Sequence, residues 1–172
     1  VNKLCDRYSF YLIFYGGEEK YYSMNTNINL YSVNVILHAN SLFNWIMLLN
    51  NEIKKKAREI FIADGYDLIH ANDWSTIPAG VAISRMYNLP LIVTIHSTEH
   101  ERGFGDPYSA MISHFEWLAC YEARHVIVKR QSTYNSLVTH LSVPREKISL
   151  IIGEDWQNKI AEIYERFRMV RV

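Results

Sequence analysis

The sequence has little cysteine, proline or glycine, and no excess of charge of either sign. Its only cysteines, Cys5 and Cys120, show no metal-ligand spacing, so we expect reduced thiols and no metal. The 18 basic and 18 acidic residues cancel, which argues against a nucleic-acid or membrane partner. The longest apolar run, residues 42–49, is too short to span a bilayer, and the first residues lack the apolar segment of a signal peptide. These absences predict a cytoplasmic protein.

What is present is enough apolar sequence for one globular domain. Hydrophobic residues make up 49% of the 172 positions, and a chain of this length buries roughly 70% of its unfolded surface on folding. No internal repeat or linker divides it. We therefore expect one domain.

The stretch 67–101 contains two short apolar runs, each followed by polar residues. The runs 68–69 and 91–95 have the composition of strands buried on both faces of a parallel sheet. A helix with Pro78 near its start is predicted between them, and it ends at 88–90. Ligands bind beyond the carboxyl ends of such strands. The polar residues placed at this edge are His70, Asn72, Asp73, Trp74, His96, Ser97, Thr98 and Glu99.

The rest of the chain alternates between helix and strand patterns. Helices are predicted from residue 40 or 41 to 62, over 108–123, from 132 or 133 to 140, and over 156–168. The first of these places Leu42, Trp45, Leu49, Ile53, Ala57 and Ile60 on one stripe. Strands are predicted at 126–128 and 148–152. This alternation predicts an α/β fold with a doubly wound, Rossmann-like sheet.

The N-terminal part is less regular. The runs 8–15 and 20–24 are separated by Gly16-Gly17-Glu18-Glu19, which favours a β-hairpin. A phosphate-binding glycine loop is the alternative, but it should open a helix and strand-like residues follow instead. The Asn-rich stretch 25–40 is expected to be an ordered loop, with either a functional role or a packing role.

Four segments in order resemble the amino-terminal domain of glycogen and starch synthases and related retaining glycosyltransferases of the GT-B fold. Residues 67–74 resemble the family's D-x-I-H-x-x-D-W, and residues 90–99 its next strand and loop. Residues 122–128 are similar to E-A-x-x-V-I-x-V, and 143–148 to V-P-x-x-K-I. Together the segments cover roughly residues 60–150.

The resemblance implies an active site in a cleft between two Rossmann-like domains. His96 corresponds to the histidine that faces the donor sugar, and Asp73 to the aspartate at the neighbouring strand end. Both are the expected catalytic residues, because a preorganised imidazole and backbone carbonyl near an oxocarbenium-like centre can position and stabilise it. The expected substrate-binding neighbours are His70, Trp74, Ser97, Thr98 and Glu99. The implied substrates are a nucleotide sugar, such as ADP-glucose or UDP-glucose, and a glucan or other saccharide acceptor, with no further cofactor.

The sequence also departs from the family. The glycine-rich K-x-G-G-L loop is absent, and Lys129-Arg130 stand where the family has a small residue and a serine. Residues 156–164 resemble the family's last helix, W-x-x-I-A-x-x-I-Y, and follow directly after the first domain. We therefore expect residues 1–152 to form the amino-terminal domain and residues 153–172 to form a crossover helix packed on it. A separate chain would supply the donor domain, and an uncovered sheet edge would favour self-association.

Two alternatives concern the same side chains. His96 and Asp73 could cap helix N-termini at the sheet edge. His96, Glu99, His100 and Glu101 could hold a metal, although they lack the H-E-x-x-H order. For the whole chain, the hypotheses are a glycogen-synthase-like hexosyltransferase, a non-catalytic saccharide-binding module, or a decayed remnant.

Overall fold

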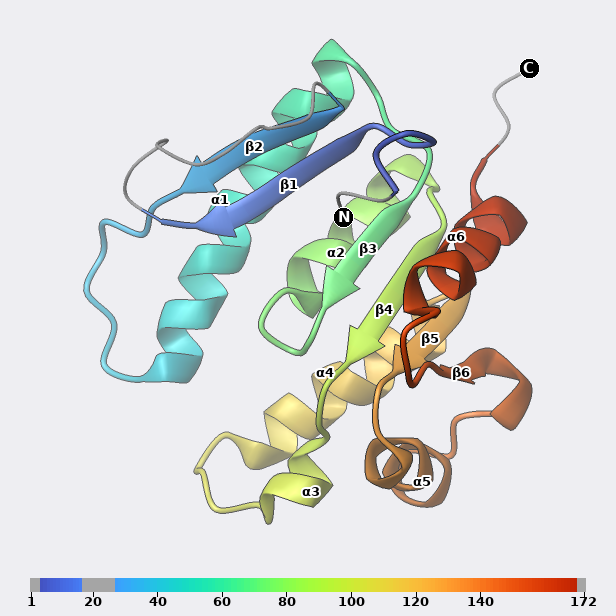
Figure 1. Ribbon diagram of the computed structural model, residues 1–172. Helices are drawn as coiled ribbons and strands as arrows, with labels where there is room; N and C mark the ends of the chain where they lie inside the picture. The colour runs from blue at the N-terminus through green and yellow to red at the C-terminus, as the bar shows by residue number, and fades with distance from the viewer. Residues whose placement is uncertain (1–3, 17–26, 170–172) are drawn as a thin grey trace. The chain divides into compact units, whose positions relative to one another are not determined.

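The computed structural model describes residues 4–16 and 27–169. It divides into two compact units, residues 1–66 and 67–172. Each unit has its own parallel sheet (Figure 1). In the part of the chain described, no helix combines the length and the apolar character that crossing a membrane requires.

The first unit consists of two parallel strands and one long helix. β1 (Phe10–Tyr15) pairs with β2 (Ile28–Val33) in a register that runs from Phe10 opposite Ile28 to Tyr15 opposite Val33. The expectation of a loop over 25–40 was therefore wrong for its central part: the β-branched and aromatic residues of β2 form strand despite the neighbouring asparagines. The predicted hairpin partner, 20–24, lies outside the described residues, and the described partner of β1 is parallel.

Helix α1 (Leu42–Ala63) begins where the sequence predicts. The Ser41 side chain accepts a hydrogen bond from the Asn44 N–H at 3.1 Å, which satisfies one of the free N–H groups of the first turn. The buried stripe is shifted by one position at this end, because Phe43 and Ile46 are buried whereas Leu42 is exposed. Leu49, Ala57 and Ile60 are buried as predicted.

The second unit contains a four-stranded parallel sheet in the order β3, β4, β5, β6 (Figure 1). The strands are β3 (Ile69–Asn72), β4 (Leu91–Ile95), β5 (His125–Val128) and β6 (Ile148–Leu150). The helices are α2 (Ile77–Tyr87), α3 (Glu99–Arg102), α4 (Ser109–Glu122), α5 (Gln131–His140) and α6 (Trp156–Phe167), and a 3₁₀ turn, η1 (Arg145–Lys147), precedes β6. The predicted α/β, Rossmann-like fold class is confirmed.

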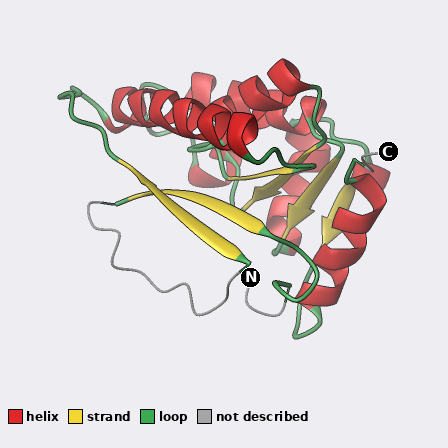
Figure 2. Cartoon of the chain, turned by 90° about the horizontal axis from the view of Figure 1, so that it is seen from above, coloured by secondary structure: helices red, strands yellow, loops and turns green. Residues whose placement is uncertain are grey.

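The two faces of this sheet differ in chemistry. One face presents Ala71, Val93 and Val126 to a core that includes residues of α2, α4 and α5. At the α2 contact, Gly80 comes so close to the sheet that a Cβ there would lie 2.8 Å from the Ala71 Cβ. α6 lies on the opposite face of the sheet (Figures 1 and 2). Strand residues alternate between the two faces, so His70 points toward α6.

Candidate active site

Asp73 occupies the turn directly after β3. Its backbone is left-handed, with φ of 62°, a conformation that Asp adopts more readily than most residues. The Asp73 N–H donates to the Thr94 carbonyl at 2.8 Å, so the turn is attached to the neighbouring strand β4. The Asp73 carbonyl accepts from the Thr76 N–H at 3.1 Å, which closes the turn into α2.

The side chain of Asp73 has an oxygen atom that the described protein leaves without a hydrogen bond. Its Oδ1 atom is buried and has no hydrogen-bond partner among the described residues. A buried carboxylate oxygen without a donor carries a desolvation cost of about 1–3 kcal/mol, so such atoms in folded proteins require an explanation. Helix capping does not explain this unpaired oxygen, because the N-cap residue of α2 is Thr76.

His96 follows β4 and leaves its side chain exposed. Its carbonyl oxygen is held from the direction of α5, where the Arg130 guanidinium and the Thr133 hydroxyl both donate to it, the latter at 3.2 Å. The N-cap of α3 is Thr98. The capping alternative therefore fails for both Asp73 and His96. The main chain of His96 is fixed while its imidazole remains available to a ligand.

His70 is placed differently from the two residues above. Its Nδ1 lies 2.5 Å from the Tyr164 hydroxyl oxygen and its Nε2 lies 2.7 Å from the Thr94 Oγ1. Burial, followed by the charges of Lys129 and His96, lowers the pKa of His70 from 6.5 to about 4. The imidazole is therefore neutral near pH 7, and both nitrogens bond within the protein. This geometry makes His70 a link between β3, β4 and α6.

The other expected substrate-binding residues also have partners in the fold. Trp74 packs against the hydrophobic core. The Ser97 Oγ accepts from Arg102 at 2.8 Å. Thr98 is fully buried and forms a capping box with Glu101, in which the Thr98 N–H donates to the Glu101 carboxylate at 2.8 Å. Trp74 thus has a packing role, and Ser97 and Thr98 hold the loop and helix that follow β4.

Glu99 belongs to a buried ionic network. Its Oε1 accepts from the Ser109 hydroxyl at 2.6 Å, and its Oε2 accepts from Arg102 at 2.7–2.8 Å. Arg102 also donates to Glu116 at 2.6 Å, and the Glu99 N–H donates to the second Glu116 oxygen at 2.9 Å. Burial raises the pKa of Glu116 from 4.5 to about 7. When Glu116 is protonated, the two charges that remain in the network are those of Glu99 and Arg102, and they cancel.

The sequence analysis did not predict this network, although the sequence contains one pattern that indicates part of it. The pattern Thr98-x-x-Glu101 is that of a capping box, which predicts a helix start with an engaged threonine. The metal alternative for His96, Glu99, His100 and Glu101 also disagrees with this arrangement, since Glu99 is turned toward Arg102. No group of three or more candidate ligands is positioned for a metal within the described ranges.

Two cations lie at the end of β5, next to the loop of His96. Lys129 places its ammonium 5.7 Å from the centroid of the Trp156 ring, and Arg130 donates to the His96 carbonyl. Lys129 is close enough to His70 for its charge to lower the pKa of that imidazole. The carboxyl edge of the sheet thus combines one carboxylate, one exposed imidazole and two cations, a set suited to a polyhydroxylated or anionic ligand.

Comparison with known proteins identifies the family. The family model for Glycosyltransferase Family 4 matches residues 6–151. The chain belongs to this family. The match covers most of both units and ends before α6, and the predicted resemblance to GT-B glycosyltransferases is confirmed at that level.

One curated relative is an uncharacterized glycosyltransferase of Methanocaldococcus jannaschii. It is 30% identical over 151 residues, which cover 81% of this chain and 38% of the relative. The chain therefore spans little more than a third of the length of that relative.

Several solved structures share the fold of this chain. A sucrose-phosphate synthase of Thermosynechococcus elongatus aligns with a TM-score of 0.65 at 15% identity, over 94% of this chain and 86% of that chain. Arabidopsis thaliana UGT89C1, solved with UDP-L-rhamnose, gives 0.55 at 8% identity, over 87% of this chain and 46% of that one. Anabaena Alr3699/HepE, solved with UDP and glucose, aligns with a TM-score of 0.51 at 18% identity, over 81% of this chain and 37% of that chain. At these identities the likeness concerns the fold alone.

Proposed function

We propose that this chain is the acceptor-side half of a glycogen-synthase-like, retaining hexosyltransferase. In this proposal the hexose comes from a nucleotide sugar such as ADP-glucose or UDP-glucose and is transferred to a saccharide. Membership of Glycosyltransferase Family 4 supports transfer of a sugar, and the D-x-I-H-x-x-D-W resemblance supports the finer assignment.

The observation that carries the proposal is the unsatisfied carboxylate of Asp73. Its Oδ1 is buried without a donor in the described protein, on a turn fixed to the end of β4. A sugar hydroxyl would supply the missing donor, and the hydrogen bond to a carboxylate is worth about 1.5–3 kcal/mol. The backbone of the turn is already in place, so only the Asp73 side chain must rotate to expose Oδ1 to the hydroxyl.

His96 has the complementary role in this proposal. Its main chain is fixed by Arg130 and Thr133, and its imidazole is exposed at the next strand end. A positioned imidazole can hydrogen-bond the hexose and stabilise the positive charge that develops at the anomeric centre. Asp73 then orients the sugar and His96 acts at the reacting centre.

Saccharide binding to the chain itself tests the proposal. We would titrate maltotetraose into the wild type, Asp73→Asn and His96→Ala by calorimetry, with circular dichroism to check the fold. Asn tolerates the left-handed turn, so Asp73→Asn removes the charge without straining the backbone. We expect at least a tenfold loss of affinity in both variants. The matched controls are Glu154→Gln and His114→Ala, since Glu154 is exposed and His114 lies on α4.

The outcomes separate the functions. Loss of binding in the two variants, with controls like the wild type, supports the acceptor site. Transfer of labelled glucose from UDP-glucose or ADP-glucose to maltotetraose distinguishes a transferase from a saccharide-binding module. A folded wild type that binds no saccharide would overturn the proposal. The decayed remnant would then be the hypothesis that remains.

A further inference from the structure

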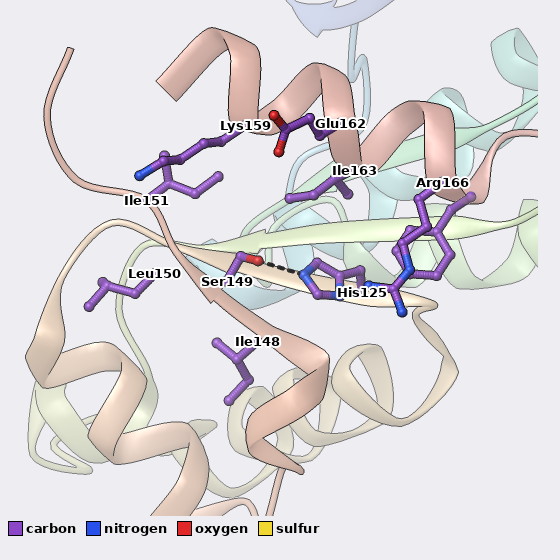
Figure 3. A pocket seen from close by; sticks show the side chains of 10 residues that line it. His125, Ile148, Ser149, Leu150, Ile151, Lys159, Glu162, Ile163 and Arg166 are labelled. Carbon is purple, nitrogen blue, oxygen red and sulfur yellow. Dashed lines mark hydrogen bonds between the residues drawn. The ribbon is translucent and has the colours of Figure 1, made fainter. Parts of the chain in front are cut away.

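A cavity of about 540 Å³ between β5, β6 and α6 does not bring its polar groups together. Figure 3 shows Lys159 and Arg166 at opposite ends of it. On the strand side, the His125 Nε2 lies 2.8 Å from the Ser149 Oγ, so these two groups bond to each other. The side chains around this cavity therefore do not converge on one ligand, and a loop beyond β4 has more specific chemistry.

Phe104, in the loop after α3, has a backbone conformation that its side chain disfavours. Its φ is 55°, and it directly follows Gly103, whose φ is 88°. A left-handed backbone has no steric cost for glycine and is tolerated by Asn and Asp, but a bulky side chain in this region is a clear outlier. Residues held in this way are concentrated at ligand sites, so the conformation of Phe104 requires an explanation.

Packing in the core does not explain the phenyl ring. Phe104 is 44% exposed, and in the described part of the chain it does not belong to the side chains that pack against the hydrophobic core. The ring meets the His100 imidazole edge to face, with centroids 4.7 Å apart. Phe104 is therefore supported by a neighbouring ring while much of its own surface faces solvent.

His100 and His140 extend this aromatic surface. His100 on α3 stacks on His140 at the end of α5, with centroids 4.3 Å apart and ring planes 6° from parallel. Burial, and then the charge of His140, lower the pKa of His100 from its ordinary value, so the ring is uncharged near pH 7. We call Phe104, His100 and His140 the aromatic cluster. It combines aromatic rings with ring nitrogens that donate or accept hydrogen bonds.

The aromatic cluster is joined to the strand-end site through α3. Only two residues separate His96 from α3, and Figure 1 shows α3 beyond the carboxyl end of β4. On α5, Thr133 donates to the His96 carbonyl at 3.2 Å. His140, seven residues later on the same helix, stacks on His100. Seven residues of helix rise about 10 Å, which is the separation of the cluster from His96 along the axis of α5.

The loop is held in place on both sides of Phe104. Arg102 donates to the carbonyl and to the hydroxyl of Ser97, each at 2.8 Å. The Asp106 carboxylate accepts from the Tyr108 N–H at 2.7 Å. A ligand that stacks on Phe104 therefore meets a ring whose backbone is already ordered, and such preorganisation lowers the entropic cost of binding.

An aromatic surface at this separation suits a sugar unit that is not the reacting one. The face of a phenyl ring is electronegative and attracts the polarised C–H groups of a pyranose, while imidazole nitrogens bond its hydroxyls. We propose that the aromatic cluster is a second subsite for the saccharide acceptor, in which Phe104 stacks on a sugar beyond the one that receives the hexose. This subsite rests on the proposed function, and it makes the acceptor an oligosaccharide.

Calorimetric titration of the full chain with maltose and maltotetraose tests the second subsite. We expect the wild type to bind maltotetraose about fivefold more tightly than maltose, because only the longer chain reaches Phe104. In Phe104→Asn most of this difference should disappear, while the affinity for maltose stays as in the wild type. Phe104→Tyr keeps the ring and should keep the difference.

Further variants separate binding from packing. Asn accepts a left-handed backbone, so Phe104→Asn should unfold at the same urea concentration as the wild type or at a higher one, whereas loss of a packing residue lowers it. Tyr121→Ala removes an exposed ring from α4, and this matched control should bind both sugars like the wild type. Asp73→Asn should weaken both sugars by the same factor, so the ratio of the two affinities stays unchanged.

The results distinguish this subsite from the strand-end site. Equal affinity of the wild type for the two sugars, or an unchanged ratio in Phe104→Asn, would overturn the second subsite and leave the Asp73–His96 site standing. A Phe104→Asn protein that is less stable and binds maltose more weakly would also overturn it, because the ring would then have a packing role. Loss of the difference in Phe104→Asn, with undiminished binding by Asp73→Asn, would support the aromatic cluster and count against the strand-end site.

Discussion

His70 and Tyr164 are 94 positions apart in the sequence, yet the His70 Nδ1 lies 2.5 Å from the Tyr164 hydroxyl oxygen. The two rings also meet edge to face, with centroids 5.6 Å apart. Through Thr94, bonded to the other His70 nitrogen at 2.7 Å, the contact extends from α6 across β3 to β4. This relationship fixes α6 to the sheet.

Replacing Tyr164 by Phe should therefore destabilise the protein. The substitution keeps the ring and removes the hydroxyl, so a partly buried imidazole nitrogen loses its partner, at a cost of about 1–3 kcal/mol. Urea denaturation measures the change in the free energy of unfolding. Tyr121→Phe is the control, because Tyr121 is 68% exposed and should change stability little. Equal stabilities for the two variants would contradict the assigned role of the hydroxyl.

Gly80 should not tolerate a side chain. A Cβ at this position would lie 2.8 Å from the Ala71 Cβ and 3.4 Å from the Leu91 Cδ1, so α2 must move away from the sheet. We expect Gly80→Ala to cost about 1–3 kcal/mol, despite the higher helix propensity of Ala. Thermal unfolding would measure the loss. Gly105→Ala, where no atom lies within 4 Å, should be close to neutral; a neutral Gly80→Ala would show that the helix has room to shift.

The Glu116 carboxyl should make stability depend on pH. Its pKa is about 7 in the folded protein against an ordinary value of 4.5. Between these values the folded state keeps a proton that the unfolded state has lost, so the stability that Glu116 contributes is present below pH 4.5 and declines as the pH rises to 7. The stability of the wild type relative to Glu116→Gln should fall by an amount on the order of 1–3 kcal/mol over this range.

Urea titrations at several pH values from 4.5 to 8 would measure that difference. Glu146→Gln, which alters an exposed carboxyl in η1, is the control and should give a difference that is nearly independent of pH. If the difference in stability between the wild type and Glu116→Gln did not change with pH, Glu116 would carry its charge over the whole range, and Arg102 would compensate it.

Cys120 should be unreactive while the protein is folded. It is 2% exposed within the core, and burial raises the pKa of its thiol to about 12. We expect iodoacetamide at pH 8 to leave Cys120 unmodified in buffer and to alkylate it in urea, as read by peptide mass spectrometry. Rapid alkylation without denaturant would show that α4 opens locally.

The sequence was sufficient for the strands and the longer helices of the second unit, because their local signals agree. The short apolar runs became β4 and β5, and Asn88, read as a helix stop, is the left-handed C-cap of α2. The first unit was harder. Residues 28–33 show no strict alternation of apolar and polar residues, and nothing local reveals that their partner is β1 in parallel.

The candidate site was predictable only in part, for a related reason. Strand ends locate Asp73 and His96, since each directly follows the last residue of a strand. The same rule selected His70, Thr98 and Glu99, whose partners Tyr164, Ser136 and Glu116 come from distant parts of the chain. Sequence proximity to a strand end gives the position of a side chain and leaves its hydrogen-bond partners undetermined.

The polar face beneath α6 also has a consequence for synthesis. His70 and Thr94 leave the ribosome long before Tyr164 does, because α6 lies at residues 156–167. Until then the nascent sheet exposes an imidazole with only one of its two bonds formed. Closing a loop of this length is entropically slow compared with local contacts. We therefore expect α6 to dock after the sheet has formed, so that one face of the sheet is hydrated until then.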